Sequence, residues 1–221
     1  HALRAHGTLK VARAGDHSTM TRSNTRQRQW LRGEERRRQL LDVAIQVAAR
    51  RGLGRTVHTE IAQDAGVAVS SVFLYFPNRM ELMSAIVADV AAFYIELARR
   101  HHGGASDPLA AVRNHFLAFA ESVETHPSYA QIWLEWAVLI RCEDGLWERF
   151  LEFQEEIIRI VARSIRLCQK AGLVPASLSA PDSARLLVAS AYTTAQLTFM
   201  KRNRKVIRRY AERALELALH L

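Results

Sequence analysis

The sequence predicts an all-α protein of about nine helices. Apolar residues recur every three or four positions between turn signals, which is the spacing of one helix face. The 221 residues include only 5 prolines and 10 glycines, and these fall mainly between the helical segments. No segment alternates polar and apolar residues for long, as a half-buried strand would. The first three helices are expected to form a small N-terminal unit, and the others a larger bundle.

Composition narrows the class of protein. Hydrophobic residues make up 49% and charged residues 24%, as in ordinary globular proteins. No apolar run reaches the roughly 18 residues of a membrane helix, and the N-terminus has no apolar leader segment. Cys142 and Cys168 are the only cysteines and lack metal-ligand spacing, so we expect free thiols in a reducing, cytoplasmic compartment. We expect no metal ion, no cofactor and no membrane partner.

Positive charge is concentrated in the first third of the chain. The net charge is +9, and residues 1–79 carry 14 Lys and Arg against 6 Asp and Glu, whereas the remainder carries 17 against 16. A localised basic segment is typical of proteins that bind a polyanion such as double-stranded DNA. The alternative is a solvated basic tail that only improves solubility.

The first helix is predicted over residues 34–51. Glutamates at its start and arginines at its end complement the helix dipole, and Gly52 stops it. The residues before position 28 are interpreted as a disordered basic tail. The apolar face of the helix consists of Leu41, Ala44, Ile45 and Ala48.

The second and third helices are predicted to form a helix-turn-helix. Thr56 is a suitable N-cap for a helix over 58–65, and Gly66 opens the turn to a helix over 69–76. A strand in place of the third helix would put one serine on each face, whereas a helix puts both on the outer face. The inward residues are Val67, Val72 and Phe76, and the outward residues are Ser70, Ser71 and Leu74.

The rest of the chain is predicted to be a bundle whose helix starts carry local caps. Asn78 and Glu81 form a capping box, Asp107 precedes Pro108, and Pro127 opens the next helix. One helix is predicted from Asn78 to about Arg100, and two more begin at Asp107 and at Pro127. A further helix ends at Ala171, and the last two run over 182–201 and 204–219.

Two stretches, DVAIQVAARRGLGRT and EIAQDAGVAVSSVFLYFPNRMEL, resemble the DNA-binding domain of the TetR family. Within that family, VFLYFPNR and IWLEW are similar to the LuxR/HapR group of quorum-sensing master regulators. The resemblance implies a basic arm over 1–27, a helix-turn-helix DNA-binding domain over 28–79, and a ligand-binding and dimerisation domain over 80–221. It also implies a homodimer that binds a near-palindromic operator.

The resemblance assigns a set of residues to DNA contact. It implies that the arm enters the minor groove, that the third helix enters the major groove, and that flanking residues touch phosphates. The residues are Arg26, Arg28, Arg36, Thr56, His58, Ser70, Ser71, Leu74, Tyr75 and Arg79. The alternatives are that Ser70 only caps the helix, that Tyr75 is a core residue, that His58 is an ordinary surface histidine, and that the arm attracts DNA non-specifically.

Two departures from the group indicate a different operator. Ala68 stands where the family commonly has a helix-capping serine, and Leu74 stands where the LuxR/HapR group has asparagine. Asparagine reads adenine through paired hydrogen bonds, whereas leucine can contact only a thymine methyl. We therefore expect general DNA binding with a changed sequence preference.

The C-terminal bundle is expected to hold a small apolar ligand. By resemblance Tyr94, Trp133 and Gln154 line the pocket, and Trp136 shares the face of Trp133. The alternative is that the aromatic residues are only core and that Gln154 bonds a backbone carbonyl. The implied dimer face consists of Ala191, Ala195, Phe199, Ile207, Tyr210, Ala214 and Ala218. The alternative is that this face packs only within one protomer.

The leading function is therefore a dimeric, ligand-modulated transcriptional regulator, either a quorum-sensing master regulator or a local repressor of an efflux or catabolic operon. An all-α enzyme is the competing class, but the sequence has no HExxH, CxxC, nucleophile elbow or glycine-rich phosphate loop. Glu135 is the one isolated acid beside the tryptophans, and we expect it to pair with an arginine. A dimeric interaction protein without DNA binding is the third class.

Overall fold

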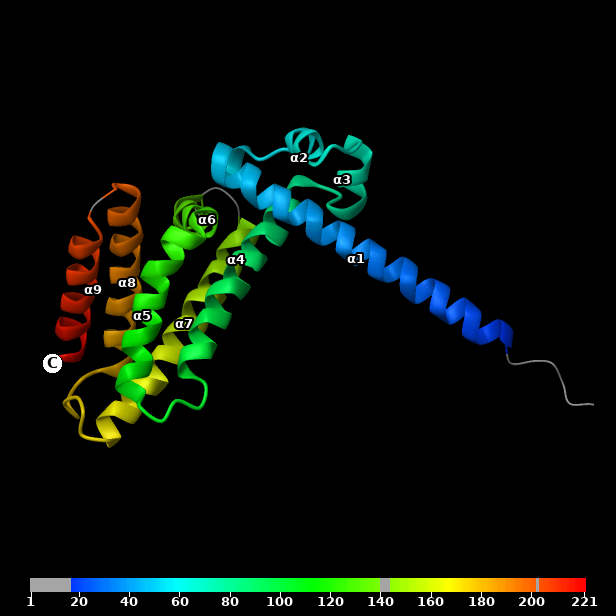
Figure 1. Ribbon diagram of the computed structural model, residues 1–221. Coiled ribbons are helices and arrows are strands. Elements are labelled where there is room, and N and C mark those ends of the chain that lie inside the picture. Colours follow the sequence, from blue (N-terminus) through cyan, green and yellow to red (C-terminus); the bar gives the residue numbers. More distant parts are fainter. Residues whose placement is uncertain (1–16, 140–143, 202) are drawn as a thin grey trace, which may run out of the picture. The chain divides into compact units, whose positions relative to one another are not determined.

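The computed structural model describes residues 17–139, 144–201 and 203–221, and every regular element in them is helical (Figure 1). The predicted all-α class is therefore confirmed. The elements are α1 (His17–Arg51), the 3-10 turn η1 (Leu53–Arg55), α2 (His58–Ala65), α3 (Val69–Tyr75), α4 (Arg79–His102), α5 (Pro108–Thr125), α6 (Pro127–Leu139), α7 (Asp144–Lys170), α8 (Ala180–Phe199) and α9 (Arg204–Leu219).

The predicted caps form because their chemistry is local. The backbone N–H of Glu81 donates to Asn78 Oδ1 at 2.8 Å, which starts α4. Asp107 Oδ1 accepts from the backbone N–H groups of Leu109 and Ala110, both at 2.9 Å, which starts α5. Gly52, with φ of 97°, follows the last residue of α1 as expected.

The start of α1 differs from the prediction. We expected a helix from residue 34 after a disordered tail, whereas α1 begins at His17. Residues 17–32 contain no proline or glycine, so nothing in the local sequence ends the helix before Gly33. Residues 1–16 lie outside the described part of the chain.

The chain divides into two compact units, the first ending at Gln39 and the second formed by Leu40–Leu221. Within the second unit one continuous core joins the helix-turn-helix to the bundle. Helices α4, α5, α7 and α8 pack around this core, and α9 lies along α8 (Figure 1). Cys168 is buried with a free thiol, as expected, whereas Cys142 lies outside the described residues. No described helix combines the length and apolar character needed to cross a membrane.

Candidate nucleic-acid interface and ligand cavity

The turn between α2 and α3 has the geometry of a helix-turn-helix. Gly66 adopts φ of 63°, in the left-handed region that favours glycine, and ends α2. The backbone N–H of Val67 then donates to the carbonyl of Ala62 at 3.0 Å. Val72 and Phe76 are fully buried, so the inner face of α3 belongs to the core, as the helical spacing predicts.

The outer face of α3 is exposed. Leu74 exposes 74% of its surface, Ser70 is also exposed, and Ser71 and Tyr75 are half-buried. Ala68 precedes the helix and supplies no side-chain cap. Sequence reasoning missed Phe73, which is exposed on the same helix and stacks on the ring of His58.

Thr56 and His58 occupy different positions from those expected. Thr56 is fully buried and donates to the carbonyl of Gly52 at 3.1 Å, so it closes η1, and the N-cap of α2 is Val57. His58 is 7% exposed, and its Nε2 lies 2.7 Å from the carbonyl oxygen of Phe76. Both side chains therefore brace the helix-turn-helix from inside, which corrects the expectation that they contact phosphates.

Several of the arginines that could contact DNA are exposed. Arg79 is exposed at the start of α4, and its Nη2 donates to the carbonyl of Gly54 at 2.8 Å. Sequence reasoning missed Arg55, which is exposed at the end of η1. In the first unit Arg36 is exposed on α1. Arg26 and Arg28 are also predicted DNA contacts, and their side chains lie outside what the structure describes.

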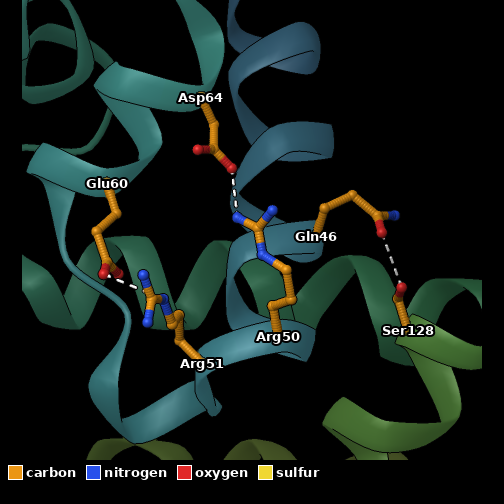
Figure 2. Close-up of polar contacts among 6 residues, drawn as sticks. All are labelled: Gln46, Arg50, Arg51, Glu60, Asp64 and Ser128. Atoms are coloured by element: carbon orange, nitrogen blue, oxygen red, sulfur yellow. Dashed lines mark hydrogen bonds and ion pairs between the residues drawn. The ribbon is translucent and has the colours of Figure 1, made fainter.

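Charged side chains fix α2 to the end of α1 (Figure 2). Arg50 pairs with Asp64, and Arg51 Nε lies 3.3 Å from Glu60 Oε1. Both arginines lie in the last turn of α1, where positive charge is favourable. They hold the first helix of the helix-turn-helix in place and leave α3 uncovered.

Helix α6 is hydrogen-bonded to α1 and to η1, near its two ends. Near its start the Ser128 hydroxyl donates to Gln46 Oε1 of α1 at 3.0 Å (Figure 2). Near its end Glu135 Oε2 accepts from the backbone N–H of Leu53 in η1 at 2.7 Å. Among the described residues the hydrogen-bond partners of Glu135 are this backbone amide and Gln131 Nε2, rather than the arginine that was predicted.

The bundle holds a small, partly open cavity of about 60 Å³. Tyr94, Trp133 and Gln154 line it, as the sequence predicts. Trp136 does not, because its indole N–H donates to the carbonyl of Leu146 at 3.2 Å and its ring packs in the core. The other lining residues are Val112, His115, Phe116, Phe119, Phe153, Ile157, Val161, Leu187, Val188 and Ala191.

Few polar atoms face this cavity. Gln154 Nε2 donates to the Tyr192 hydroxyl at 2.6 Å, so its partner is a side chain and not a backbone carbonyl. Trp133 stacks on Tyr192 with ring centroids 4.0 Å apart. Within the described residues, the Trp133 indole nitrogen and the Tyr94 hydroxyl are buried without a hydrogen bond of normal geometry. Burial raises the pKa of both Tyr94 and Tyr192, so both phenols stay neutral.

Two histidines form a pair beside the cavity that sequence reasoning missed. His102 Nε2 lies 3.1 Å from His115 Nδ1, and His102 Nδ1 lies 2.7 Å from the Ser164 hydroxyl. Burial, with smaller effects of His102 and His101, lowers the pKa of His115 to about 3. Burial and His101 lower the pKa of His102 to about 4. Both rings are therefore neutral at pH 7.

Comparison with known proteins agrees with this geometry. Residues 40–86 match the N-terminal domain of the bacterial regulatory proteins of the tetR family. The HTH-type transcriptional regulator LuxR of Vibrio harveyi is 32% identical over 120 residues, covering 53% of this chain and 56% of LuxR. Residues 40–86 are therefore similar to the DNA-binding domain of TetR-family regulators. The chain aligns over only about half the length of this relative, and the matched domain contains the helix-turn-helix.

Solved structures of transcriptional regulators share the fold. A TetR transcription regulator from Haloarcula marismortui ATCC 43049 superposes with a TM-score of 0.73 and 14% identity, covering 84% of this chain and 97% of that one. The regulator FadR of Bacillus subtilis, in complex with stearoyl-CoA, superposes with a TM-score of 0.69 and 17% identity, covering 82% of this chain and 96% of that one. At this identity the likeness shows the fold alone.

The predicted dimer face is partly buried within the protomer. Ala191, Ala195, Ile207 and Ala218 contribute to the protomer's own packing. Phe199 is exposed, and Tyr210 and Ala214 are half-buried. The exposed large apolar residues of α8 and α9 are Leu186, Phe199, Val206 and Leu217.

Proposed function

We propose that the protein is a dimeric transcriptional regulator that binds double-stranded DNA through α3 and responds to a small ligand in the bundle cavity. The observation that carries the proposal is the division of α3 into a buried inner face and an uncovered outer face. The outer face presents Ser70 and Leu74, and Arg55 and Arg79 are exposed on neighbouring elements. Such a helix, flanked by cations, suits a major groove and its phosphates.

Ligand response is supported by the size of the cavity and by the attachments of α6. About 60 Å³ is far below the roughly 300–1,000 Å³ of typical ligand sites, so a ligand must displace the walls. Trp133 of α6 is one wall, and Ser128 and Glu135 link the same helix to α1 and η1. Displacement of α6 would therefore change the position of the DNA-binding helices and shift the population that fits the operator.

Dimerisation is supported by the exposed apolar residues of α8 and α9. Val206, Tyr210 and Leu217 recur at helical spacing along one side of α9. A second copy related by a two-fold axis would cover this surface and would place two α3 helices for a near-palindromic operator.

The decisive experiment is binding of the purified chain to fragments of its own genome, measured by mobility shift at several salt concentrations. We expect sequence-selective shifts whose affinity falls as salt rises, because phosphate contacts release counterions. Arg55→Ala should weaken binding to all sites, whereas Arg185→Ala, an exposed arginine on α8, should not. Absence of any shift at low salt would exclude the proposal.

Leu74 is the residue proposed to set sequence preference. We expect Leu74→Asn to change the selected motif while non-specific affinity is unchanged, because asparagine reads adenine and leucine does not. Selection from a random DNA library checks this, and identical motifs for both proteins would reject it.

The likeness to LuxR supports a quorum-sensing master regulator as the finer role, and the undersized cavity supports a ligand-responsive local repressor of an efflux or catabolic operon. Genomic footprinting separates the two. Sites spread over many promoters would favour the first, and a single site beside a neighbouring operon would favour the second.

A further inference from the structure

We propose that a basic segment, residues 201–209, binds the DNA phosphates between the two half-sites of the operator. The inference adds a second DNA contact, outside the helix-turn-helix, and rests on the proposed function, which supplies the DNA and the dimer. It follows from the charge of the segment, from the helix end on which that charge lies, and from the place of the segment in the bundle.

Positive charge is concentrated in the basic segment. Its sequence, KRNRKVIRR, includes six Lys and Arg and no Asp or Glu. The rest of residues 80–221 carries 11 Lys and Arg against 16 Asp and Glu, so the bundle is otherwise acidic. A local positive potential on an acidic domain indicates a localised anionic partner.

The described cations of the basic segment fall into two groups. Arg204 pairs with Glu124 of α5, and Arg208 Nε lies 3.0 Å from Glu212 Oε1. The other cations are exposed, and no ion pair engages them within the described residues: Lys201, Lys205 and Arg209. These three side chains can therefore meet an external anion without breaking a contact of the protomer.

The charge lies at the end of α9 where it does not help the helix. Arg204 and Lys205 occupy the first turn of α9, which contains no acidic residue. The N-terminal end of a helix is the positive end of its dipole, so cations there are unfavourable. Asn203 Oδ1 already caps the helix by accepting from the backbone N–H of Lys205 at 2.8 Å. The cations are therefore better explained by an anionic partner than by the stability of α9.

The basic segment lies at the end of the bundle that is joined to the DNA-binding helices. Arg204 pairs with Glu124 in the last turn of α5, and α6 begins shortly after it at Pro127 (Figure 1). The Ser128 hydroxyl of α6 then donates to Gln46 Oε1 of α1 at 3.0 Å. In the proposed dimer, which uses α8 and α9, the segment would lie near the two-fold axis at this end. It would therefore meet the operator between the half-sites.

An acidic lipid surface is the competing partner. Phe199, Met200 and Val206 are exposed beside the cations, and apolar residues next to cations are typical of interfacial helices. The main apolar face of α9 is not available to enter a bilayer, because Ile207 and Leu215 are buried within the protomer. The position of the segment at the end joined to the DNA-binding helices favours DNA.

The test removes the three free cations and measures the salt dependence of DNA binding. Lys201→Gln, Lys205→Gln and Arg209→Gln are combined in one variant. Fluorescence anisotropy gives its affinity, from 0.1 to 0.5 M salt, for an operator fragment that the wild type selects. Loss of one phosphate contact per protomer of the dimer should reduce the slope of log affinity against log salt by about 2. Affinity should fall at least about tenfold at 0.1 M salt and much less at 0.5 M.

A matched variant separates a local contact from a general loss of charge. Arg163→Gln, Arg166→Gln and Lys170→Gln remove the same charge from exposed positions toward the end of α7. The 20 residues of α8, about 30 Å of helix, lie between that end and the basic segment. This variant should keep the wild-type slope and affinity. All six substituted side chains are exposed, so both variants should fold, which far-ultraviolet circular dichroism checks.

Two further measurements locate the contact. Selection from a random DNA library should return the same motif for the wild type and the triple variant of the basic segment, because phosphate contacts carry no sequence information directly. In hydroxyl-radical footprinting, this variant should lose backbone protection between the half-sites and keep it within them.

The outcomes distinguish this inference from the proposed function. A slope equal to that of the wild type, or one reduced equally in the matched variant, would overturn the inference and leave the proposed function intact. Loss of binding to vesicles of acidic phospholipid, with unchanged DNA binding, would assign the segment to a membrane instead. A wild type that binds no DNA would remove both.

Discussion

His115 and His102 show how burial of single residues sets the response of this protein to acid. Their rings contact each other and Ser164 inside the bundle, and burial holds the pKa of each below the ordinary value of about 6.5. In the unfolded chain both histidines take up a proton near pH 6.5, whereas in the folded chain they do so only near pH 3 and 4. The contribution of these two histidines to stability is therefore full above pH 6.5 and is lost as the pH falls toward these values.

We predict that urea unfolding gives a lower free energy of unfolding at pH 5 than at pH 7, by about 2 kcal/mol from His115 alone. His115→Gln removes this contribution, so the difference between the two pH values should shrink in that variant. His220→Gln, at an exposed position near the C-terminus, should keep the wild-type difference. Equal pH dependence in the wild type and His115→Gln would contradict the assignment.

At the scale of elements, α6 links the cavity to α1 and η1. It carries Trp133 at the cavity, and its Glu135 accepts from the backbone N–H of Leu53 at 2.7 Å and from Gln131 Nε2 at 3.3 Å. Leu53 itself is fully buried. Without Glu135 its amide would lack this charged acceptor.

We predict that Glu135→Ala lowers the free energy of unfolding by about 1.5–3 kcal/mol, the range for a hydrogen bond to a charged group. It should also reduce the change in operator affinity that a cavity ligand causes, because α6 would lose its link to η1. Glu135→Gln keeps an acceptor oxygen and should lose less of both. Urea unfolding and fluorescence anisotropy on operator DNA, with and without ligand, measure the two effects. A full ligand effect in Glu135→Ala would show that α6 does not transmit the change.

Sequence reasoning predicted elements whose signals are local, and it failed where contacts with residues distant in the sequence determine the structure. Asn78, Asp107 and Gly66 act on neighbouring backbone groups, so the starts of α4 and α5 and the turn after α2 were predictable. The start of α1 has no such signal. The partner of Glu135 lies 82 positions away, and nothing near Glu135 in the sequence identifies it.

The same distinction between local and distant signals applies to the residues of the candidate sites. The outward position of Leu74 follows from helical spacing alone. The burial of His58 depends instead on the carbonyl of Phe76, which only the folded turn brings within 2.7 Å. Trp136 lies three positions from Trp133 but faces Leu146 and the core, because three residues of a helix turn the side chain by less than a full revolution.

At the scale of the whole molecule, the proposed dimer rests on the exposed apolar residues of α8 and α9. Leu217 exposes 60% of its surface, and Val206 and Phe199 are exposed on the same pair of helices. Exposed large apolar residues that gather on adjacent elements are typical of interfaces. Covering them in a dimer would also set the spacing of the two α3 helices, so operator binding is expected to depend on this contact.

We predict that the wild type has twice the protomer mass of 25.0 kDa in light scattering, and that Leu217→Glu shifts it toward the single protomer. A buried glutamate facing its own copy across a two-fold axis would bring two like charges together without counter-ions. Leu173→Glu adds the same charge at an exposed leucine between α7 and α8 and should leave the mass unchanged. Because Leu217 is exposed in the protomer, the variant should still fold, with an unchanged far-ultraviolet circular dichroism spectrum. Its operator affinity should fall with its dimer fraction. A wild type of single-protomer mass, or a fully dimeric Leu217→Glu, would place the interface elsewhere or remove it.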